Sequence, residues 1–174
     1  MYDGELIRLR AYEPTDVDAL LRWVNDPALR PFLSRRYPFS RATEEEWARA
    51  CATPSFGNAH FVIEARDTGE AIGTVALRSA SAENRSAELG IQIAEEAYRD
   101  RGYGTDAMRT TCQFGFVEMG LHRIQLWVQA DNPRARHVYR NLGFVEEGVA
   151  RQARRGRPGW TDMVLMGILE GELT

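Results

Sequence analysis

The feature that most limits the fold is a run of three β-strand patterns separated by very short turns. Residues 60–66, 71–79 and 87–93 are rich in apolar and β-branched side chains, and turns at Asp67-Thr68-Gly69 and Glu83-Asn84 separate them. A parallel connection between neighbouring strands needs a crossover of a dozen or more residues, and these turns are too short for one. The middle of the chain is therefore predicted to be an antiparallel meander.

On either side of the meander the apolar spacing changes several times between strand and helix. Capping-box spacing (Thr15 with Asp18, Thr43 with Glu46) indicates two helix starts, and Gly120 and Gly143 indicate two helix ends. The expected helices are 15–25, one from Thr43 onward, 103–119 and 133–142, and the further strands are 5–11, 121–130, 144–155 and 160–169, the last two as a hairpin around residues 156–159. With no repeat or linker, we expect one domain over residues 1–174. The fold class is α/β (α+β type), with a single mixed, mostly antiparallel sheet flanked by helices.

The composition excludes several classes of protein. All 22 residues counted as Lys plus Arg are Arg, so no lysine is available for a Walker A loop, a Schiff base or a kinase strand. A net charge of −3 lacks the basic surface of a nucleic-acid-binding protein. No apolar run is long enough for a membrane span, and no signal-peptide region is visible. Because Cys51 and Cys112 form no metal-ligand pair, we expect no metal site and a reducing, cytoplasmic setting.

The strongest local signal is the segment Arg-Asp-Arg-Gly-Tyr-Gly-Thr at residues 99–105, called the glycine turn below. Glycine lets a backbone approach a ligand closely, and the free amides of a first helical turn favour an anion such as a pyrophosphate. Arg99 and Arg101 add donors suited to phosphate. The segment also fits a plain helix start with two solvated arginines. Residues 102–107 formally match the dinucleotide fingerprint, but they do not directly follow a strand or lie among repeated βαβ units, which disfavours a Rossmann cofactor.

A second pattern, N-x-x-A-x-x-x-Y-x-x-x-G-F, runs from Asn132 to Phe144, and on a helix Asn132, Ala135 and Tyr139 share one face. Taken alone, it describes a capped helix with a packed tyrosine and a glycine stop. With the glycine turn before it, the chain resembles the GNAT superfamily of N-acetyltransferases, most closely the branch of RimJ, RimL and the spermidine acetyltransferases. The resemblance is strongest from about Ala87 to Phe144 and covers the rest of the chain more weakly. Residues 94–97 depart from the family by lacking a proline common there.

The resemblance implies a GNAT-like acyl-CoA N-acyltransferase fold with acetyl-CoA as the acetyl donor. The backbone of Ile91, Gln92 and Ile93 would pair with the pantetheine arm like an added strand, and an amide there would polarise the thioester carbonyl. Asn132 would hold the pantetheine arm. Tyr139 would contact the cofactor and protonate the departing sulfur, since a phenol and a thiol have similar pKa values. The pyrophosphate would be cradled by the amides of Arg99, Asp100, Arg101, Gly102, Tyr103, Gly104 and Thr105.

Glu88 is the candidate general base, because it precedes Gly90 by two residues on the strand expected to pair with the donor. A solvent-facing strand glutamate explains it equally well. An α-amine is already partly neutral at pH 7, so ordered water could replace the base, whereas a polyamine nitrogen of pKa near 10.4 needs more help.

The resemblance also implies an amine-bearing acceptor, which could be a protein N-terminus, a polyamine, an amino acid or another small amine. Direct attack in a ternary complex is expected, although Cys112 leaves a ping-pong route open. Family members are often dimers, so a homodimer is one expected assembly. A catalytically silent acyl-CoA-binding module and a dinucleotide-dependent enzyme are the rival interpretations. Aromatic and acidic side chains that suit a cation, but equally a core, are expected near the acceptor: Phe32, Tyr37, Phe39, Trp47, Trp160 and Asp162.

Overall fold

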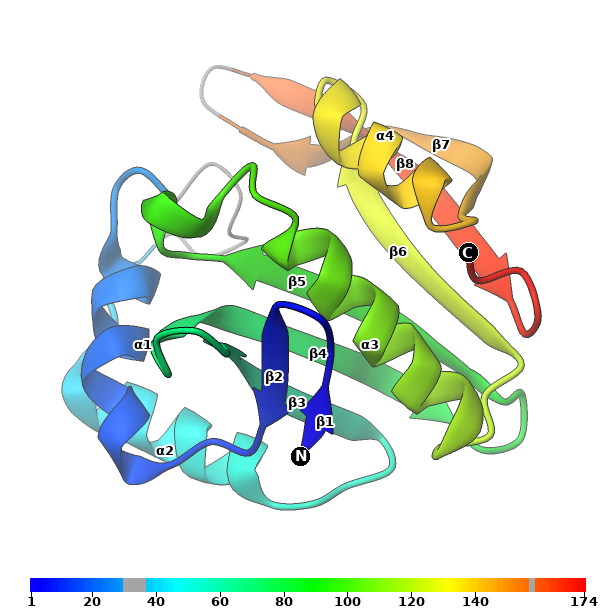
Figure 1. The fold of residues 1–174 in the computed structure, drawn as a ribbon. Helices are drawn as coiled ribbons and strands as arrows, with labels where there is room; N and C mark the ends of the chain where they lie inside the picture. The colour runs from blue at the N-terminus through cyan, green and yellow to red at the C-terminus, as the bar shows by residue number, and fades with distance from the viewer. Residues whose placement is uncertain (30–36, 157–158) are drawn as a thin grey trace.

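The computed structural model of the chain describes residues 1–29, 37–156 and 159–174. It contains an 8-stranded sheet in the order β1-β2-β3-β4-β5-β6-β8-β7 (Figure 1). Every neighbouring pair is antiparallel except β5 and β6, which are parallel. The predicted mixed, mostly antiparallel sheet is therefore confirmed. The strands are Tyr2–Asp3 (β1), Ile7–Arg10 (β2), Asn58–Ala65 (β3), Ala71–Ser81 (β4), Ser86–Ile93 (β5), Arg123–Gln129 (β6), Val145–Arg155 (β7) and Trp160–Leu169 (β8).

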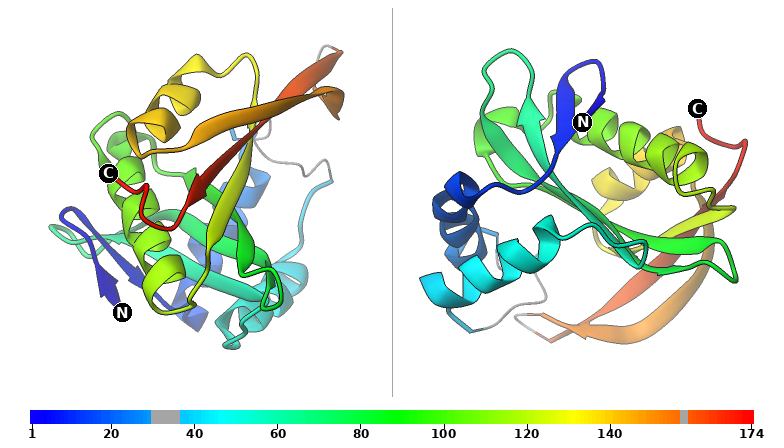
Figure 2. Two further views of the ribbon diagram at one scale, coloured as in Figure 1. Left: turned by 90° about the vertical axis from the view of Figure 1, so that its right-hand side faces the viewer. Right: turned by 90° about the horizontal axis from the view of Figure 1, so that it is seen from below.

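The helices cover both faces of the sheet, α1 and α2 on one side and α3 and α4 on the other (Figure 2). They are Val17–Asn25 (α1), Arg41–Ala52 (α2), Tyr103–Val117 (α3) and Pro133–Asn141 (α4), with short 3-10 turns at Pro14–Asp16 (η1) and Glu96–Tyr98 (η2). Among the helices of the described ranges, none is long and apolar enough to cross a membrane.

Both predicted capping boxes were wrong in position. The α2 helix starts at Arg41 because Ser40 has extended backbone angles and its hydroxyl accepts the amide of Thr43 at 3.2 Å. The box before α1 joins Glu13 and Asp16 around η1. In each case the cap is taken by a residue whose own backbone is still extended, as capping requires.

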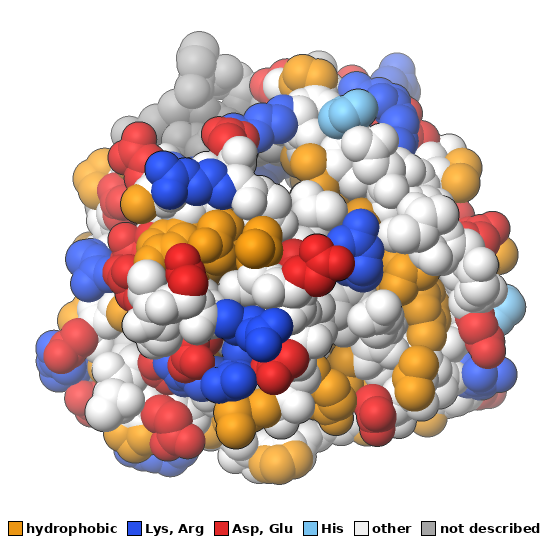
Figure 3. All heavy atoms as spheres, in the orientation of Figure 1, with side chains coloured by type: hydrophobic (Ala, Val, Ile, Leu, Met, Phe, Trp, Pro, Cys, Tyr) orange, Lys and Arg blue, Asp and Glu red, His pale blue; other side chains and the backbone are white. Residues whose placement is uncertain are grey.

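Strand alternation gives the sheet two apolar faces. On the α3 side, Leu77, Leu89, Ile124 and Met166 pack with Met108 of α3. Outside that core, acidic and basic side chains are interspersed over the surface (Figure 3). The opposite surface of the sheet, called the α1 face below, packs Val62 of β3 against α1 and α2. Along β5, Ala87 and Leu89 face α3, so Glu88, Gly90 and Gln92 face the other way.

The parallel strands β5 and β6 pair over a short stretch and then separate. Their register covers Ser86 with Arg123, Ala87 with Ile124, and Glu88 with Gln125. Beyond these pairs β5 continues along β4 and β6 continues along β8, and the two strands diverge toward the starts of α3 and α4 (Figure 1). The sheet is therefore open between β5 and β6 at one end.

Candidate active site

The open end of the sheet leaves one edge of β5 without a strand neighbour among the described residues. Ile91, Gln92 and Ile93 pair with Val75, Thr74 and Gly73 of β4 on their other edge. An unpaired strand edge presents N–H and C=O groups that can hold an extended ligand as an added strand. The three residues predicted to pair with the pantetheine arm all lie on this edge, and their backbone fits that group.

The glycine turn lies where β5 leads into α3. Gly102 precedes the helix with φ of 88°, a left-handed conformation that favours glycine, and no side chain caps the helix. The first intrahelical bond of this turn runs from the Asp106 amide to the Gly102 carbonyl at 2.9 Å. The amides of Tyr103, Gly104 and Thr105 therefore have no acceptor within the helix, which leaves them available for an anion.

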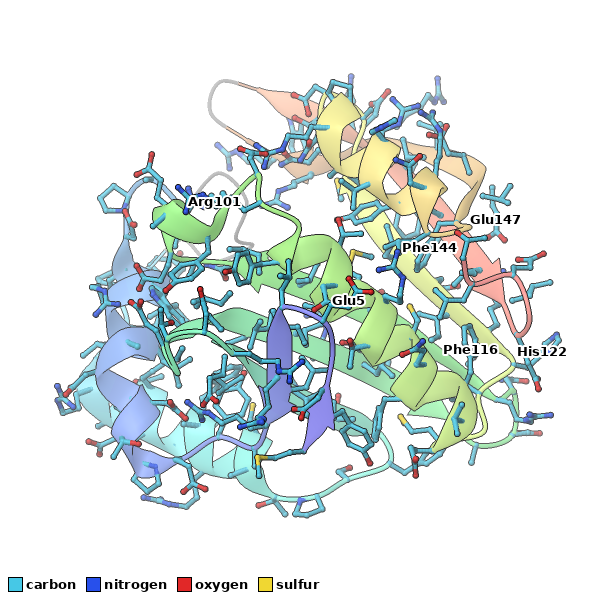
Figure 4. All side chains as sticks on the ribbon, in the orientation of Figure 1. Glu5, Arg101, Phe116, His122, Phe144 and Glu147 are labelled. Carbon is cyan, nitrogen blue, oxygen red and sulfur yellow. The ribbon has the colours of Figure 1, made fainter. Side chains whose placement is uncertain are left out.

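The two arginines of the glycine turn have different surroundings. Arg99 donates from Nε to the Ile93 carbonyl at 3.1 Å and from Nη2 to the Ala94 carbonyl at 2.6 Å. Its guanidinium thus holds the turn against the end of β5, and the phosphate contact of Arg99 stays a prediction. Arg101 is exposed and makes no hydrogen bond or ion pair within the described ranges, and it lies at the end of the molecule where α3 begins (Figure 4). Arg101 therefore keeps all of its N–H donors for a ligand, whereas Arg99 keeps those that the two carbonyls leave.

The second motif lies across the opening, on the helix that follows β6. Asn132 caps α4, and its Oδ1 accepts the Ala135 amide at 3.0 Å, which leaves its Nδ2 as a donor. Arg134 of the first turn of α4 forms an ion pair with Asp100 of the glycine turn. This contact joins the two sides of the opening, so both motifs border the same space.

Tyr139 lies on α4 with its ring against the core. The ring centroid is 6.1 Å from that of Phe144, whose side chain is buried beside α4 (Figure 4). Within the described ranges the Tyr139 hydroxyl has no hydrogen-bond partner, and burial raises the pKa of the phenol. The group therefore stays protonated at neutral pH and can donate.

Glu88 lies at the point where β5 and β6 part, opposite Arg78 on β4 and Gln125 on β6. Its Oε1 is 3.0 Å from Nη2 of Arg78, and its side chain is 34% exposed. The carboxylate is thus accessible on the α1 face beside the open edge. It can accept a proton there, as a general base must.

The residues predicted around the acceptor lie in different parts of the structure. The ring centroid of Trp47 lies 5.5 Å from that of Tyr12 and 6.0 Å from that of His60, so packing in the core explains the position of Trp47. Asp162 lines a hollow of about 610 Å³ with Arg151 and Gln152, and its Oδ1 accepts the Gln152 amide at 2.7 Å. Tyr37 and Trp160 are exposed, Phe39 is partly buried, and these three do not line the hollow. Phe32 lies outside the described residues.

Sequence reasoning missed two polar side chains that fix distant segments of the chain to their helices. The buried carboxylate of Asp106 in α3 accepts the amides of residues 5–7 at 2.7–3.1 Å and so fixes the β1–β2 turn, where Figure 4 places Glu5 beside α3. Asn25 at the end of α1 exchanges two hydrogen bonds with the backbone of Phe39, at 2.9 and 3.0 Å. Their residue types were visible in the sequence, but nothing indicated partners so distant along the chain.

Cys112 is fully buried, and burial raises the pKa of its thiol to about 12. A neutral, inaccessible thiol is not a nucleophile, so the structure gives no support to a ping-pong route through Cys112. In the parts of the chain that the structure describes, no three His, Cys, Asp or Glu side chains are grouped as a metal ion would require.

Comparison with known proteins identifies the family of the chain. The family model described as acetyltransferase (GNAT) domain matches residues 7–145. The putative ribosomal N-acetyltransferase YdaF of Bacillus subtilis is 29% identical over 97% of this chain and 94% of that protein. YoaA, an uncharacterized N-acetyltransferase of the same organism, is 37% identical over 52% of this chain, and the chain spans about half of that protein's length, 50%. The spermidine N(1)-acetyltransferase of Escherichia coli K12 is 38% identical over 51% of this chain and 46% of that protein.

Solved structures agree in fold. A spermidine N-acetyltransferase from Vibrio cholerae, in complex with CoA and spermine, superposes with a TM-score of 0.88 and 26% identity over 97% of this chain and 98% of that chain. The family match covers most of the sequence, and the open sheet edge, the glycine turn and the second motif all lie within it. The chain belongs to the GNAT acetyltransferase domain family.

Proposed function

We propose that the protein is an N-acetyltransferase that moves the acetyl group of acetyl-CoA to a primary amine by direct attack. The observation that carries this proposal is the parting of β5 and β6, with the glycine turn on one side and Tyr139 on the other. The V. cholerae enzyme that shares the fold was solved with CoA and spermine, which supports both the donor and an amine acceptor.

The donor would lie in the opening between β5 and β6. Its pantetheine arm would extend along Ile91, Gln92 and Ile93, with the Nδ2 group of Asn132 as a further donor. Its pyrophosphate would meet the free amides of the glycine turn, with Arg101 adjacent. Charge-assisted bonds of this type are the stronger class of hydrogen bond, so the turn would supply much of the donor affinity.

The chemistry would proceed in one ternary complex. The amine nitrogen attacks the thioester carbon, and the new C–N bond forms as the carbonyl oxygen gains negative charge. An amide on the open edge of β5 would stabilise that oxygen. The C–S bond then breaks, Tyr139 protonates the sulfur, and the proton lost by the amine passes to Glu88 or to water.

We propose a cytoplasmic setting for this reaction. Cys51 and Cys112 form no disulfide, which suits a reducing cytoplasm. Family resemblance makes a homodimer the assembly to test first, by light scattering of the purified chain. We propose no metal requirement, because each step above uses a group of the chain itself.

Calorimetry and a thiol-release assay test this function together. Acetyl-CoA should bind and NAD should not, and CoA thiol should appear when a suitable amine is added. The amine panel should contain peptides with free N-termini, polyamines, amino acids and aminoglycosides. Binding of acetyl-CoA without thiol release from any amine would identify a silent acyl-CoA-binding module. Binding of NAD alone would instead favour a dinucleotide-dependent enzyme.

A further inference from the structure

One side chain beside the candidate base has no role in the proposed reaction. Arg78 of β4 lies opposite Glu88 in the register, and its guanidinium extends over the neighbouring strand at Gly90. A Cβ atom built on Gly90 would lie 2.8 Å from Nη2 and 3.1 Å from Cζ of Arg78. Glycine at this position therefore makes room for a guanidinium directly above β5, on the α1 face.

Most of the hydrogen-bonding capacity of Arg78 is unused. A guanidinium has five N–H donors in a planar fork, and within the described ranges Arg78 forms one hydrogen bond, to Glu88 at 3.0 Å. Its side chain is 48% exposed, so the remaining donors are accessible. A planar fork with free donors is the group that binds a carboxylate in a bidentate manner.

The charges nearby do not favour an acceptor that carries several positive groups. Glu88 is already paired with Arg78, and Glu147, further along the same sheet, is paired with Arg123. Burial and the neighbouring Arg78 both lower the pKa of His60, on the adjacent strand β3. The carboxylate of Glu88 thus lies beside a guanidinium that would repel a second positive charge.

We propose that the acceptor is an α-amino acid or a close analogue, whose carboxylate binds Arg78 while its amine faces Glu88. This inference rests on the proposed function and specifies its substrate class. In an α-amino acid a single carbon atom separates the amine from the carboxyl group. A zwitterion placed between Arg78 and Glu88 would replace their direct ion pair by two, with the amine beside the open edge of β5 where the thioester carbonyl would lie.

The test compares acceptors that differ only in the carboxylate. Wild-type kcat/KM, measured by thiol release with saturating acetyl-CoA, should be at least ~10-fold higher for free amino acids than for the corresponding amides, because a hydrogen bond to a charged group contributes on that scale. Spermidine and peptides with amidated C-termini should react as slowly as the amino acid amides.

Arg78→Gln should reduce kcat/KM for the free acid by ~10- to 100-fold, mainly through KM, and should change kcat/KM for the amide by a much smaller factor. The matched control is Arg85→Gln, since Arg85 has a comparably exposed side chain, 55%, and pairs with Glu170 just before β5 begins. This control should retain the wild-type preference for the acid.

Two results would overturn the proposal while leaving the acetyltransferase function intact. One is a wild-type enzyme that acetylates polyamines or amides as fast as amino acids. The other is an Arg78→Gln variant that loses the same factor with the acid and with the amide, because a merely structural role would affect both. Bound acetyl-CoA with no thiol release from any acceptor would refute the proposed function itself, and this inference with it.

Discussion

Replacing Tyr139 by Phe removes one oxygen atom from a position where the fold does not need it. The hydroxyl has no partner among the described residues, and the ring that packs beside Phe144 is kept. Deleting a polar atom that makes no internal hydrogen bond should change the free energy of unfolding by less than about 1 kcal/mol. A loss of activity in this variant would therefore report on chemistry.

The expected loss of turnover follows from what the hydroxyl donates. General acid catalysis contributes about 10²- to 10⁴-fold. A thiol, with a pKa of about 8.5, is a fairly good leaving group without help, so the lower end applies. We expect kcat of Tyr139→Phe to fall about 100-fold, which corresponds to ~2.7 kcal/mol of transition-state stabilisation. Because burial raises the pKa of Tyr139, wild-type kcat should not decline through loss of this acid below about pH 10.

The assay measures thiol release at saturating substrates, with calorimetry of acetyl-CoA and thermal unfolding beside it. Donor affinity and melting temperature should match the wild type. Tyr2→Phe is the control, because Tyr2 is also partly buried and packs 4.7 Å from Phe114, away from the opening between β5 and β6. If Tyr139→Phe retains wild-type kcat over the whole pH range, Tyr139 is not the acid.

Three further predictions concern buried or paired side chains: Asp106, Cys112 and Glu95. Asp106→Ala should lower the free energy of unfolding by about 3–5 kcal/mol, since it leaves three backbone amides of the β1–β2 turn without their acceptor; a loss below 1 kcal/mol in denaturant titration would contradict this. Cys112 should resist thiol reagents in the folded protein, and Cys112→Ala should keep the wild-type turnover and the sequential kinetics of a ternary complex. Trapping of an acetyl-enzyme intermediate would contradict this prediction. Burial opposes the charge of Glu95, but hydrogen bonds from Trp23, at 2.7 Å, and from Arg22 lower its pKa overall. Stability from this contact is present above the ordinary Glu pKa and is lost as the pH falls through the lowered folded value. Glu95→Gln should therefore melt below the wild type at pH 7 and at the same temperature in strong acid, and a difference that persists in acid would refute the linkage.

Local signals in the sequence were sufficient for most of the fold. The meander follows from turns of two or three residues, and the glycine turn and second motif mark helix starts that the structure places at Tyr103 and Pro133. These features depend on neighbours in the chain, which a sequence displays directly. The errors at Ser40 and Glu13 show the limit of that approach. Several polar residues stood close enough to cap each helix, and only the backbone angle of each one decides which does so.

The site was harder to predict wherever a side chain had a choice of distant partners. For Arg99 the sequence predicts a phosphate contact but not its two hydrogen bonds to the carbonyls of Ile93 and Ala94, which hold the guanidinium against the end of β5. The neighbour of Arg78 across the sheet depends on strand register, and Asp106 depends on a turn about one hundred residues earlier. Such contacts are set by tertiary structure and leave no local pattern.

The short pairing of β5 with β6 also divides the sheet into two parts that few backbone pairs connect. Three register pairs join the strands β1 to β5 to the strands β6, β7 and β8. A donor lying along Ile91 to Ile93 would fill the opening between the two parts of the sheet. Donor binding would therefore also strengthen the contact between these parts. At a donor concentration of 100 times Kd, binding linkage adds about 2.7 kcal/mol to the folded state. This stabilisation should slow the hydrogen exchange of backbone amides at the open edge of β5. The bound donor would then act as an additional strand of the sheet.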